Sequence, residues 1–307
     1  MDIGLLLRTL FKLYAVLLLG FLMAKTRILD SHTNRSLSVM VVSVTYPAKL
    51  LWSMLGQPGD RGEALLLMLG GLGIYLAVLV LSKGISRLLR VPEDRRREFE
   101  CLMVFTNTGF IGAPLAQSLF GDAAFYQMTL MNFAYYILYN TYGTTALMPR
   151  EGGRKIRLTA KDVLTPGFVM TVLAIVLFLL HADAPPVAKE LLNMVGDMTT
   201  PLSMIILGAS LAEYPFRDSI GDKWTYVYSA VKLLCMPALA FGICRLIGLG
   251  SYHSALSVLT CSMPAGSMVL MLALKLNRDS AFISRSIFVS TLLSAITLPA
   301  VILLFVR

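Results

Sequence analysis

Apolar residues fill long, nearly uninterrupted stretches of this chain, and short polar or charged connections separate them. Ten stretches are long enough to cross the hydrocarbon core of a bilayer as a helix, which takes about 20 residues. They run over residues 4–24, 37–56, 64–89, 99–120, 123–148, 163–181, 190–212, 223–248, 253–276 and 280–306. The pattern predicts an all-α polytopic membrane protein with ten transmembrane helices.

The fourth stretch carries residues that an unbroken membrane helix avoids. Residues 105–114 read Phe-Thr-Asn-Thr-Gly-Phe-Ile-Gly-Ala-Pro, and they fall near the middle of the span. Proline removes a helix hydrogen bond and clashes with the preceding turn. Non-helical backbone is tolerated at that depth only where it is buried in protein or lines a water-filled cavity. Since secondary transporters build substrate sites from such broken helices, this stretch is the first candidate for a binding site.

The ninth stretch has a similar interruption, because residues 260–267 read Thr-Cys-Ser-Met-Pro-Ala-Gly-Ser. A single proline or glycine usually only kinks a membrane helix. Two interruptions at related positions favour a crossing instead, where two half-helix N-termini would offer N–H groups and partial positive charge to an anion. Asn107 fits either a ligand or a helix cap, and both roles are compatible. The candidate substrate-binding residues are Thr106, Asn107, Thr108, Gly109, Gly112, Pro114, Cys261, Ser262, Pro264, Gly266 and Ser267.

Two short matches relate the halves of the chain. Asp-Ala-Ala-Phe at 122–125 matches Asp-Ser-Ala-Phe at 279–282, and Thr-Tyr-Pro at 45–47 matches Thr-Thr-Pro at 199–201. The separations are 157 and 154 residues, so nearly one register serves both matches. Five stretches per half is an odd number, and the second copy must therefore insert upside down. We expect a first five-helix repeat over residues 1–150 and a second, inverted repeat over residues 151–307.

Composition and charge agree with a membrane protein. The chain of 307 residues is 56% hydrophobic and 15% charged, which leaves no stretch for a soluble domain. Its net charge of +9 comes from lysines and arginines in short loops, which argues for topology signals and contact with anionic lipids, not for nucleic-acid binding. Eighteen of them lie in the odd-numbered loops and three, Arg61, Lys189 and Arg245, in the even-numbered ones. The positive-inside rule then predicts a multi-pass protein of the cell's inner (plasma) membrane with both termini extracytoplasmic.

Ionisable residues inside predicted spans are functional candidates, because burying a charge in a bilayer is costly. Lys232 lies well inside the eighth stretch, Lys49 follows a proline in the second, and Asp197 is the one carboxylate placed inside a span away from its ends. Asp197 either takes part in coupling or pairs with a lysine as a structural bridge. Lys49 either attracts substrate or extends to the membrane surface, and Arg285 is expected to reach the surface.

No constellation of residues points to an enzyme or a metal site. The four cysteines have no metal-ligand spacing, and the three histidines fall at loops or span ends. Metalloprotease, nucleophile-elbow and Walker-type motifs are missing from the sequence. We therefore expect no catalytic activity, no resident cofactor and no metal, with H⁺ or Na⁺ as the possible coupling ion.

Four segments together resemble the auxin efflux carrier family, which includes the plant PIN-FORMED proteins and bacterial malonate and malate carriers. The segments are residues 107–114, 201–211, 232–237 and 290–299, and the resemblance covers essentially the whole chain. It implies ten helices in two inverted five-helix repeats, with the fourth and ninth crossing at their prolines. It also implies a scaffold domain of helices 1, 2, 6 and 7 and a transport domain of helices 3–5 and 8–10. The long central hydrophilic loop of the plant exporters is missing here, which puts auxin itself in doubt.

Three functions follow as hypotheses. The leading one is a secondary active transporter of small organic anions, either auxin-like or dicarboxylate, that works by an elevator type of alternating access. We expect its scaffold helices to form a homodimer through their apolar faces. The second is a cation/proton antiporter of the same fold, which would need a carboxylate at the crossing. The third is a non-transporting membrane sensor or scaffold, and the lack of an appended soluble signalling domain in this sequence counts against it.

Overall fold

The computed structural model describes residues 3–56, 61–148, 166–213, 222–276 and 278–306, and this part of the chain is helical apart from one isolated β-bridge. All ten predicted stretches have helical counterparts. In the first half these are α1 (Ile3–Lys25), α2 (Ser31–Met40) with η1 (Val41–Thr45) and α3 (Tyr46–Met54), α4 (Arg61–Leu88), α5 (Glu93–Val104) with η2 (Thr108–Gly112) and α6 (Ala113–Phe120), and α7 (Asp122–Met131) with α8 (Phe133–Leu138), η3 (Tyr139–Gly143) and α9 (Thr144–Leu147).

The second half continues the same arrangement. Its helices are α11 (Pro166–Leu179), α12 (Pro186–Asp197) with α13 (Thr199–Glu213), α15 (Lys223–Ala230) with η4 (Val231–Cys235) and α16 (Met236–Leu246), α17 (Ser251–Ser262), α18 (Ser267–Lys275) and α19 (Ala281–Phe305). The connection between the predicted stretches 123–148 and 163–181 lies outside the described residues. The chain is therefore an all-helical polytopic membrane protein.

Six of these helices, within the described ranges, are long and apolar enough to cross a membrane. The other four predicted stretches are interrupted or shorter, which explains the difference between six and the predicted ten. The fourth, fifth and ninth contain breaks, and the sixth is described only from Pro166. The six candidate spans are Leu7–Lys25, Ser31–Met54, Arg61–Leu88, Pro186–Ala212, Lys223–Leu246 and Ala281–Phe305.

Three prolines inside membrane helices each follow a π-helical turn. The turns η1, η2 and η4 end two residues before Pro47, Pro114 and Pro237, respectively. A proline ring clashes with the carbonyl four residues earlier and has no N–H to donate. The wider π turn removes that carbonyl from the α-helical register, so that the helix continues past the proline. These prolines therefore bend their helices without ending them.

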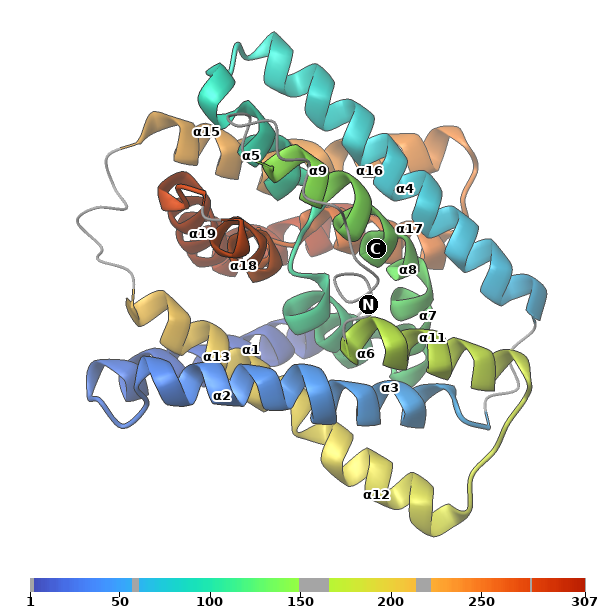
Figure 1. Cartoon of the computed structure of the whole chain (residues 1–307). Helices are drawn as coiled ribbons and strands as arrows, with labels where there is room; N and C mark the ends of the chain where they lie inside the picture. The colour runs from blue at the N-terminus through green and yellow to red at the C-terminus, as the bar shows by residue number, and fades with distance from the viewer. Residues whose placement is uncertain (1–2, 57–60, 149–165, 214–221, 277, 307) are drawn as a thin grey trace.

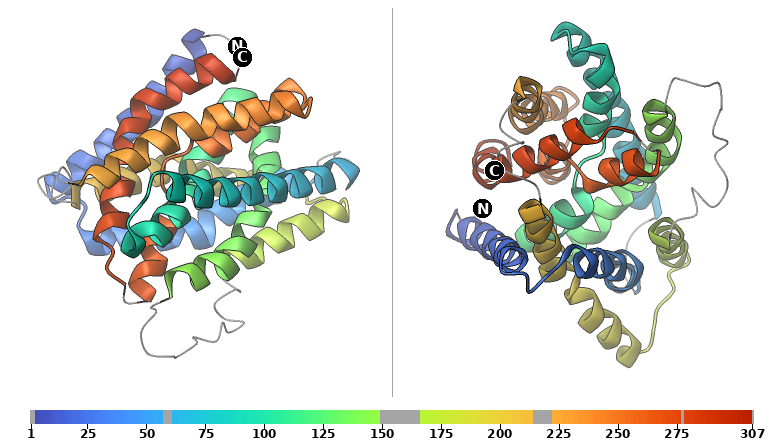
Figure 2. Two further views of the ribbon diagram at one scale, coloured as in Figure 1. Left: turned by 90° about the horizontal axis from the view of Figure 1, so that it is seen from above. Right: turned by 60° about the vertical axis from the view of Figure 1, so that its left-hand side comes forward.

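The helices form two groups, visible on opposite sides of the molecule in Figure 1. Along one side α1 packs closely on α13, and α3 packs on α11 and α12. The α1–α13 contact needs glycine: a Cβ on Gly208 would lie 1.8 Å from the carbonyl oxygen of Leu17, and one on Gly20 would lie 2.2 Å from that of Ile205. On the other side α4 packs on α5, α15 on α19, and α16 on α17. The two chain ends lie close together in all three views (Figures 1 and 2).

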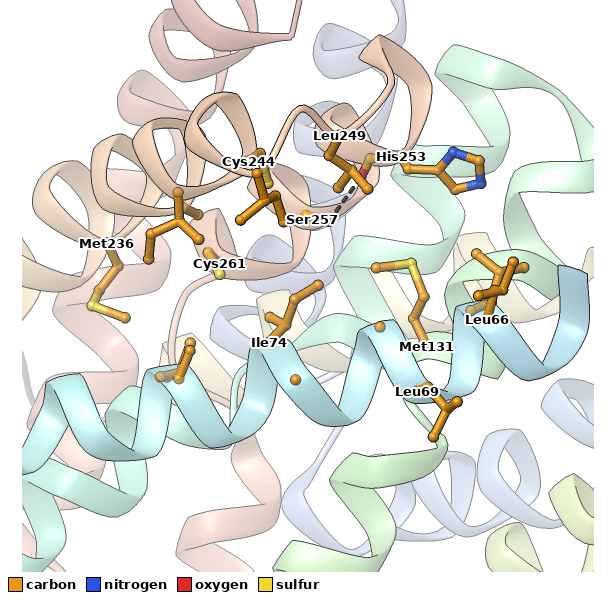
Figure 3. A pocket seen from close by; sticks show the side chains of 18 of the residues that line it. Leu66, Leu69, Ile74, Met131, Met236, Cys244, Leu249, His253, Ser257 and Cys261 are labelled. Atoms are coloured by element: carbon orange, nitrogen blue, oxygen red, sulfur yellow. Dashed lines mark hydrogen bonds between the residues drawn. The ribbon is translucent and has the colours of Figure 1, made fainter.

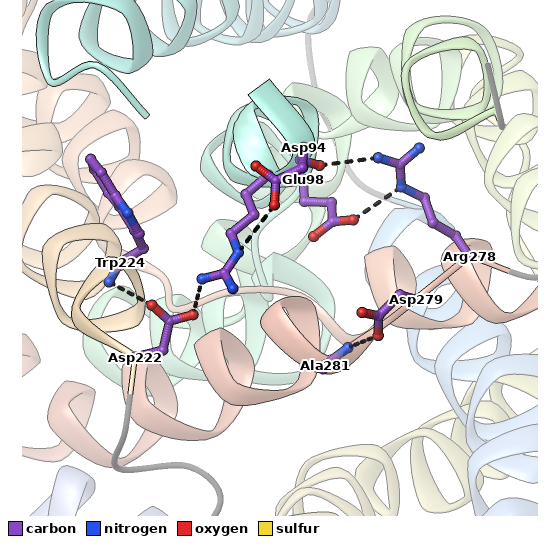
Figure 4. Close-up of polar contacts among 8 residues, drawn as sticks. Asp94, Glu98, Asp222, Trp224, Arg278, Asp279 and Ala281 are labelled. Atoms are coloured by element: carbon purple, nitrogen blue, oxygen red, sulfur yellow. Dashed lines mark hydrogen bonds and ion pairs between the residues drawn. The ribbon is translucent and has the colours of Figure 1, made fainter. Parts of the chain in front are cut away.

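A polar network ties the start of α5 to the second half of the chain (Figure 4). Arg95 pairs with Asp222, the residue that caps α15, and Arg278 Nε lies 3.0 Å from Glu98 Oε1. Arg278 also donates to the Asp94 carbonyl at 3.3 Å. Glu98 is buried, and burial raises the pKa of its carboxyl while Arg278 opposes the rise. The network thus anchors the first turns of α5, the helix that is interrupted after Val104.

Candidate functional site

Two interrupted helices cross at the centre of the molecule, and their backbones pair there. The helix α5 ends at Val104 and α17 ends at Ser262, and Thr106 then lies opposite Ala265 in an antiparallel bridge. The N–H of Asn107 donates to the Pro264 carbonyl at 2.9 Å. Both predicted interruptions are present, and each satisfies the backbone groups that the other exposes.

The bridge can form because a glycine lies where the two chains come closest. A Cβ on Gly266 would lie 2.9 Å from the carbonyl oxygens of both Phe105 and Thr106. These are backbone atoms fixed by the bridge, so they cannot move aside for a side chain. Gly112 also faces the crossing, but its nearest neighbours are the flexible side chains of Met128 and Met263. Gly266 is therefore the position where the crossing demands the absence of a side chain.

The helix α19 supplies a third support that the sequence did not mark as part of the site. Ser290 Oγ accepts the N–H of Ala265 at 3.2 Å, so this residue is held from both sides. The hydroxyl of Thr106 donates to the Thr260 carbonyl at 3.4 Å. Serine in a membrane helix usually bonds to its own preceding turn, and its role at a distant bridge carries no sequence signal.

Asn107 combines a helix cap with an unused hydrogen-bond donor. Its Oδ1 accepts the N–H of Phe110 at 3.3 Å and so caps the turn that begins at Thr108. Its Nδ2 is buried and has no hydrogen-bond partner among the described residues, in a side chain only 5% exposed. An unpaired buried amide costs about 1–3 kcal/mol. Two residues further along, a Cβ on Gly109 would meet no atom within 4 Å, so there is open space at that position of the η2 turn.

The position of the break in the fourth segment differs from the expectation of a crossing at two prolines. Pro264 does lie at the bridge, whereas Pro114 lies inside α6, seven residues after Asn107. The π turn η2 accommodates Pro114, so this proline leaves the helix continuous. The break itself falls at residues 105–107, before the asparagine cap.

Lys232 and Tyr228 bind the open end of α5. Where α5 stops, its last carbonyl groups lose their helical partners. The Tyr228 hydroxyl donates to the Leu102 carbonyl at 3.0 Å, and Lys232 Nζ donates to the Met103 carbonyl at 3.2 Å. Lys232 is only 1% exposed. Its positive charge therefore lies at the partially negative C-terminus of a half-helix, a favourable position for a cation.

An aromatic cluster lies beside the bridge on the side of α8. The ring of Phe105 contacts Tyr135 and Tyr139 edge to face, with centroids 5.4 and 5.5 Å apart. The Tyr139 hydroxyl donates to the Met268 carbonyl in α18 at 2.9 Å. The Tyr75 hydroxyl of α4 donates to Asn132 Oδ1, at the break between α7 and α8. These residues were missed from the sequence, where tyrosines in a span are indistinguishable from ordinary core residues.

Lys49 and Asp197 form an ion pair away from the crossing. Lys49 Nζ lies 2.6 Å from Asp197 Oδ1, 3.5 Å from Asn193 Oδ1 and 4.0 Å from the Trp52 ring centroid. The lysine is buried, whereas the Asp197 side chain is 58% exposed. No hydrogen bond within the described part of the chain joins either residue to the crossing. The pair connects α3 to α12. These helices can approach closely because residue 196 is a glycine, and a Cβ at this position would lie only 2.7 Å from the Lys49 Cα.

A second carboxylate in the predicted spans is more deeply buried than Asp197. Glu100 lies in α5, is 7% exposed, and accepts the hydroxyl of Ser86 at 2.7 Å and that of Tyr142 at 3.1 Å. It forms no ion pair with the described lysines and arginines. Glu100 is the second residue of the predicted span 99–120, at its end, and was therefore not among the ionisable residues singled out inside the spans.

The crossing brings together most of the predicted binding residues, but not Pro114, which lies inside α6. Thr106, Thr108, Cys261, Ser262, Gly112, Pro264 and Gly266 are buried at the crossing with Asn107, while Gly109 and Ser267 are partly exposed. Ser267 begins α18 and so places a helix N-terminus beside the bridge. No group of three histidine, cysteine, aspartate or glutamate residues that could hold a metal occurs within the described ranges.

Comparison with known proteins agrees with this arrangement. The family model described as "Membrane transport protein" matches residues 5–302. An uncharacterized transporter of Methanothermobacter thermautotrophicus is 23% identical over 299 residues, which is 95% of each chain. The uncharacterized transporter MJ1031 of Methanocaldococcus jannaschii is 23% identical over 228 residues, or 73% of each chain. Protein PIN-LIKES 2 of Arabidopsis thaliana is 30% identical over 104 residues, which is 29% of this chain and 23% of the plant protein.

Proposed function

The chain belongs to the membrane transport protein family of auxin efflux carriers, and from that premise we propose that it transports small organic anions, either auxin-like or dicarboxylate, as a secondary active transporter. Family membership makes it a membrane transporter and not an enzyme. The substrate class is our proposal.

One observation carries the proposal: the buried Nδ2 of Asn107 has no hydrogen-bond partner in the described chain and belongs to a crossing of broken helices. The half-helices that begin at Thr108 and Ser267 each add partial positive charge. A carboxylate would accept a hydrogen bond from Asn107 and interact favourably with both N-termini. Lys232, whose Nζ donates to the Met103 carbonyl, adds a positive charge at the end of α5.

The alternative of a cation/proton antiporter has less support. Such a protein needs a carboxylate at the crossing, and none occurs at 105–108 or 262–267. The nearest buried carboxylate, Glu100, lies before the end of α5, where it is bonded to two hydroxyl groups. A non-transporting sensor or scaffold is disfavoured by the family of the chain.

For the mechanism we propose an elevator type of alternating access. Ten spans would form two inverted repeats, residues 1–150 and 151–307, with helices 1, 2, 6 and 7 as scaffold and helices 3–5 and 8–10 as transport domain. The packing of α1 on α13 and of α3 on α11 and α12 supports a distinct scaffold group. The closeness of the start of α1 and the end of α19 supports an even number of spans, and the excess of lysine and arginine in the odd-numbered loops favours extracytoplasmic termini in the cell's inner membrane. A homodimer through the scaffold completes this proposal.

Coupling to H⁺ or Na⁺ forms a separate part of the proposal. A proton needs a carboxylate whose environment changes during transport, and two candidates exist. Asp197 is half exposed and paired with Lys49, whereas Glu100 is buried and has only hydroxyl partners. Glu100, whose described partners are neutral hydroxyl groups, is the first of the two carboxylates to test for a role in coupling.

Uptake into proteoliposomes tests the function directly. The purified protein would be reconstituted and supplied with radiolabelled malonate, malate, succinate or indole acetate, each with and without gradients of pH and Na⁺. Saturable uptake of at least one anion, lost in Asn107→Ala, supports the proposal. Proton-driven efflux of Na⁺ without anion uptake would instead identify an antiporter. No flux of any solute, by a protein that keeps its wild-type thermal stability, would contradict transport of these classes.

A further inference from the structure

A long groove separates α4 from the hairpin of α16 and α17 (Figure 3). It has a volume of about 860 Å³. In the figure, Leu66, Leu69 and Ile74 line one wall, and Met236, Cys244 and Cys261 line the opposite one. The groove is distinct from the crossing, although Cys261 belongs to both.

The groove opens toward the hydrocarbon of the bilayer. Its α4 wall belongs to the candidate span Arg61–Leu88, and Leu66 in that wall is 70% exposed. Two glycines leave the wall open, because a Cβ on Gly70 or Gly73 would meet no atom within 4 Å. A groove with so few polar atoms offers water too few hydrogen-bond partners to hold it. Hydrocarbon is the medium that such a surface accommodates best.

The groove is long enough to hold a lipid chain. Along α4 the lining residues extend from Gly62 to Leu81. At about 1.5 Å per residue this is a rise of about 28 Å, close to the ~30 Å thickness of a bilayer's hydrocarbon core. A solute of the size of a small carboxylate would occupy only a fraction of this length. One lipid chain spans a single leaflet, about 15 Å, and would fill about half of the groove when it runs parallel to α4 from one end.

The groove's acidic and imidazole side chains occur at one end only. Glu63, in the first turn of α4, and His253, near the start of α17, lie together at this end, and the lining contains no lysine or arginine. Glu63 Oε1 accepts a hydrogen bond from Gln127 Nε2 at 2.9 Å, and Gln127 Oε1 in turn accepts one from the Tyr252 hydroxyl. Glu63 has no ion-pair partner among the residues that the structure describes. A headgroup with an ammonium ion would complement this carboxylate, whereas an anionic headgroup would be repelled.

We propose that this groove binds a membrane lipid, with one hydrocarbon chain along α4 and an amine-bearing headgroup beside Glu63. The lipid fills the gap between two membrane helices that the protein itself leaves open. The site does not depend on the transported solute. It requires only that α4 faces the bilayer and that Glu63 is ionised.

The test compares two leucine substitutions on one helix. Gly73→Leu places a side chain inside the groove, and Gly84→Leu places the same side chain on α4 where a Cβ would also meet no atom within 4 Å, outside the groove. Each protein would be reconstituted in nanodiscs of equal phosphatidylethanolamine and phosphatidylglycerol, extracted in mild detergent, and examined by native mass spectrometry. We expect Gly73→Leu to lose about tenfold in retained phospholipid, equivalent to ~1.4 kcal/mol, and Gly84→Leu to match the wild type.

The headgroup is tested with Glu63→Gln, which keeps a hydrogen-bonding group for Gln127 and removes the charge. The wild type should retain phosphatidylethanolamine in preference to phosphatidylglycerol, and Glu63→Gln should lose this preference while it still binds lipid. Equal retention by Gly73→Leu and the wild type would overturn the proposal. So would an unchanged headgroup preference in Glu63→Gln, or a loss of dimers in Gly73→Leu without any loss of lipid, which would assign the groove to a second copy of the chain.

Discussion

The N–H of Gly266 donates to the carbonyl of Phe105 across 3.0 Å, which joins two interrupted helices that are more than 150 residues apart in the sequence. With the neighbouring bond from Asn107 to Pro264, it gives membrane-buried backbone the partners that a helix would otherwise provide. The crossing thus stabilises the fold and brings the candidate ligand groups together. The first two predictions separate these two effects.

Gly266→Ala should destabilise the protein by about 1–3 kcal/mol and abolish transport, because its Cβ would collide with backbone that the bridge fixes. Thermal unfolding of the purified protein and uptake in proteoliposomes measure the two effects. Gly109→Ala is the stability control, since its Cβ would enter open space. Wild-type stability in Gly266→Ala would show that the crossing is more adaptable than the bridge implies.

Asn107→Ala should abolish transport, since it removes the unpaired donor, and should cost at most about 1 kcal/mol of stability, because loss of the buried unpaired amide offsets part of the lost cap of η2. Asn107→Ser separates the two roles, because serine is a good cap but lacks the amide donor. We expect Asn107→Ser to regain most of the stability and none of the uptake. Recovery of uptake together with stability would mean that Asn107 acts as a cap alone.

Lys232→Met should lower thermal stability and anion affinity, because it leaves the buried Met103 carbonyl without a partner, at a cost of about 1–3 kcal/mol. Lys232→Arg should recover little of the thermal stability and anion affinity that Lys232→Met loses, since the planar guanidinium differs in shape from the compact ammonium that fits this site. Tyr228→Phe is the matched variant for the adjacent carbonyl of Leu102. Wild-type unfolding and kinetics in Lys232→Met would refute this role.

Asp197→Asn should destabilise the protein by about 2 kcal/mol, because it leaves the buried Lys49 without its counter-charge. The double variant Lys49→Met/Asp197→Asn should regain stability, since it removes both charges. If the pair is structural, pH-driven flux and counterflow stay at the wild-type ratio in the double variant. Loss of pH-driven flux with intact counterflow would assign proton coupling to Asp197.

Arg278→Met should destabilise the protein by about 2–4 kcal/mol near neutral pH, because the buried Glu98 carboxylate loses its cation. Burial already raises the pKa of Glu98 above its ordinary value, so its folded form favours the protonated carboxyl. Stability linked to this group is therefore greatest at low pH and falls as pH rises through the raised pKa.

The loss in Arg278→Met should accordingly shrink as the pH is lowered from about 8 to 5, as measured by thermal unfolding. Glu98→Gln, whose amide cannot ionise, is the control. When Arg278→Met is made in this background, its loss of stability should not change between about pH 8 and pH 5. A loss in Arg278→Met that stays constant over this range would contradict the pairing with Glu98.

Several parts of the site were readable from residues alone. Pro264 and Gly266 predicted an interruption because no other residues break a membrane helix so effectively, and Asn107 predicted a cap beside the other break. The prediction that the fourth stretch is broken at Pro114 was wrong. The π turn η2 accommodates this proline without interrupting the helix, and a π turn has no recognisable sequence pattern. The support from Ser290 and Tyr228 was not predictable, because a serine or tyrosine in a span has the same local pattern whether or not it reaches a distant carbonyl.

The sequence by itself determined the membrane class, the positions of the helices and the two interruptions, since these follow from local hydrophobicity and local backbone chemistry. The tertiary structure decided which groups meet. It paired the two breaks, directed Lys232 to the end of α5, joined Lys49 to Asp197, and buried Glu100 among hydroxyl groups. These contacts join residues that lie far apart in the sequence, and the distance between such residues depends on how the helices pack, which no local pattern encodes.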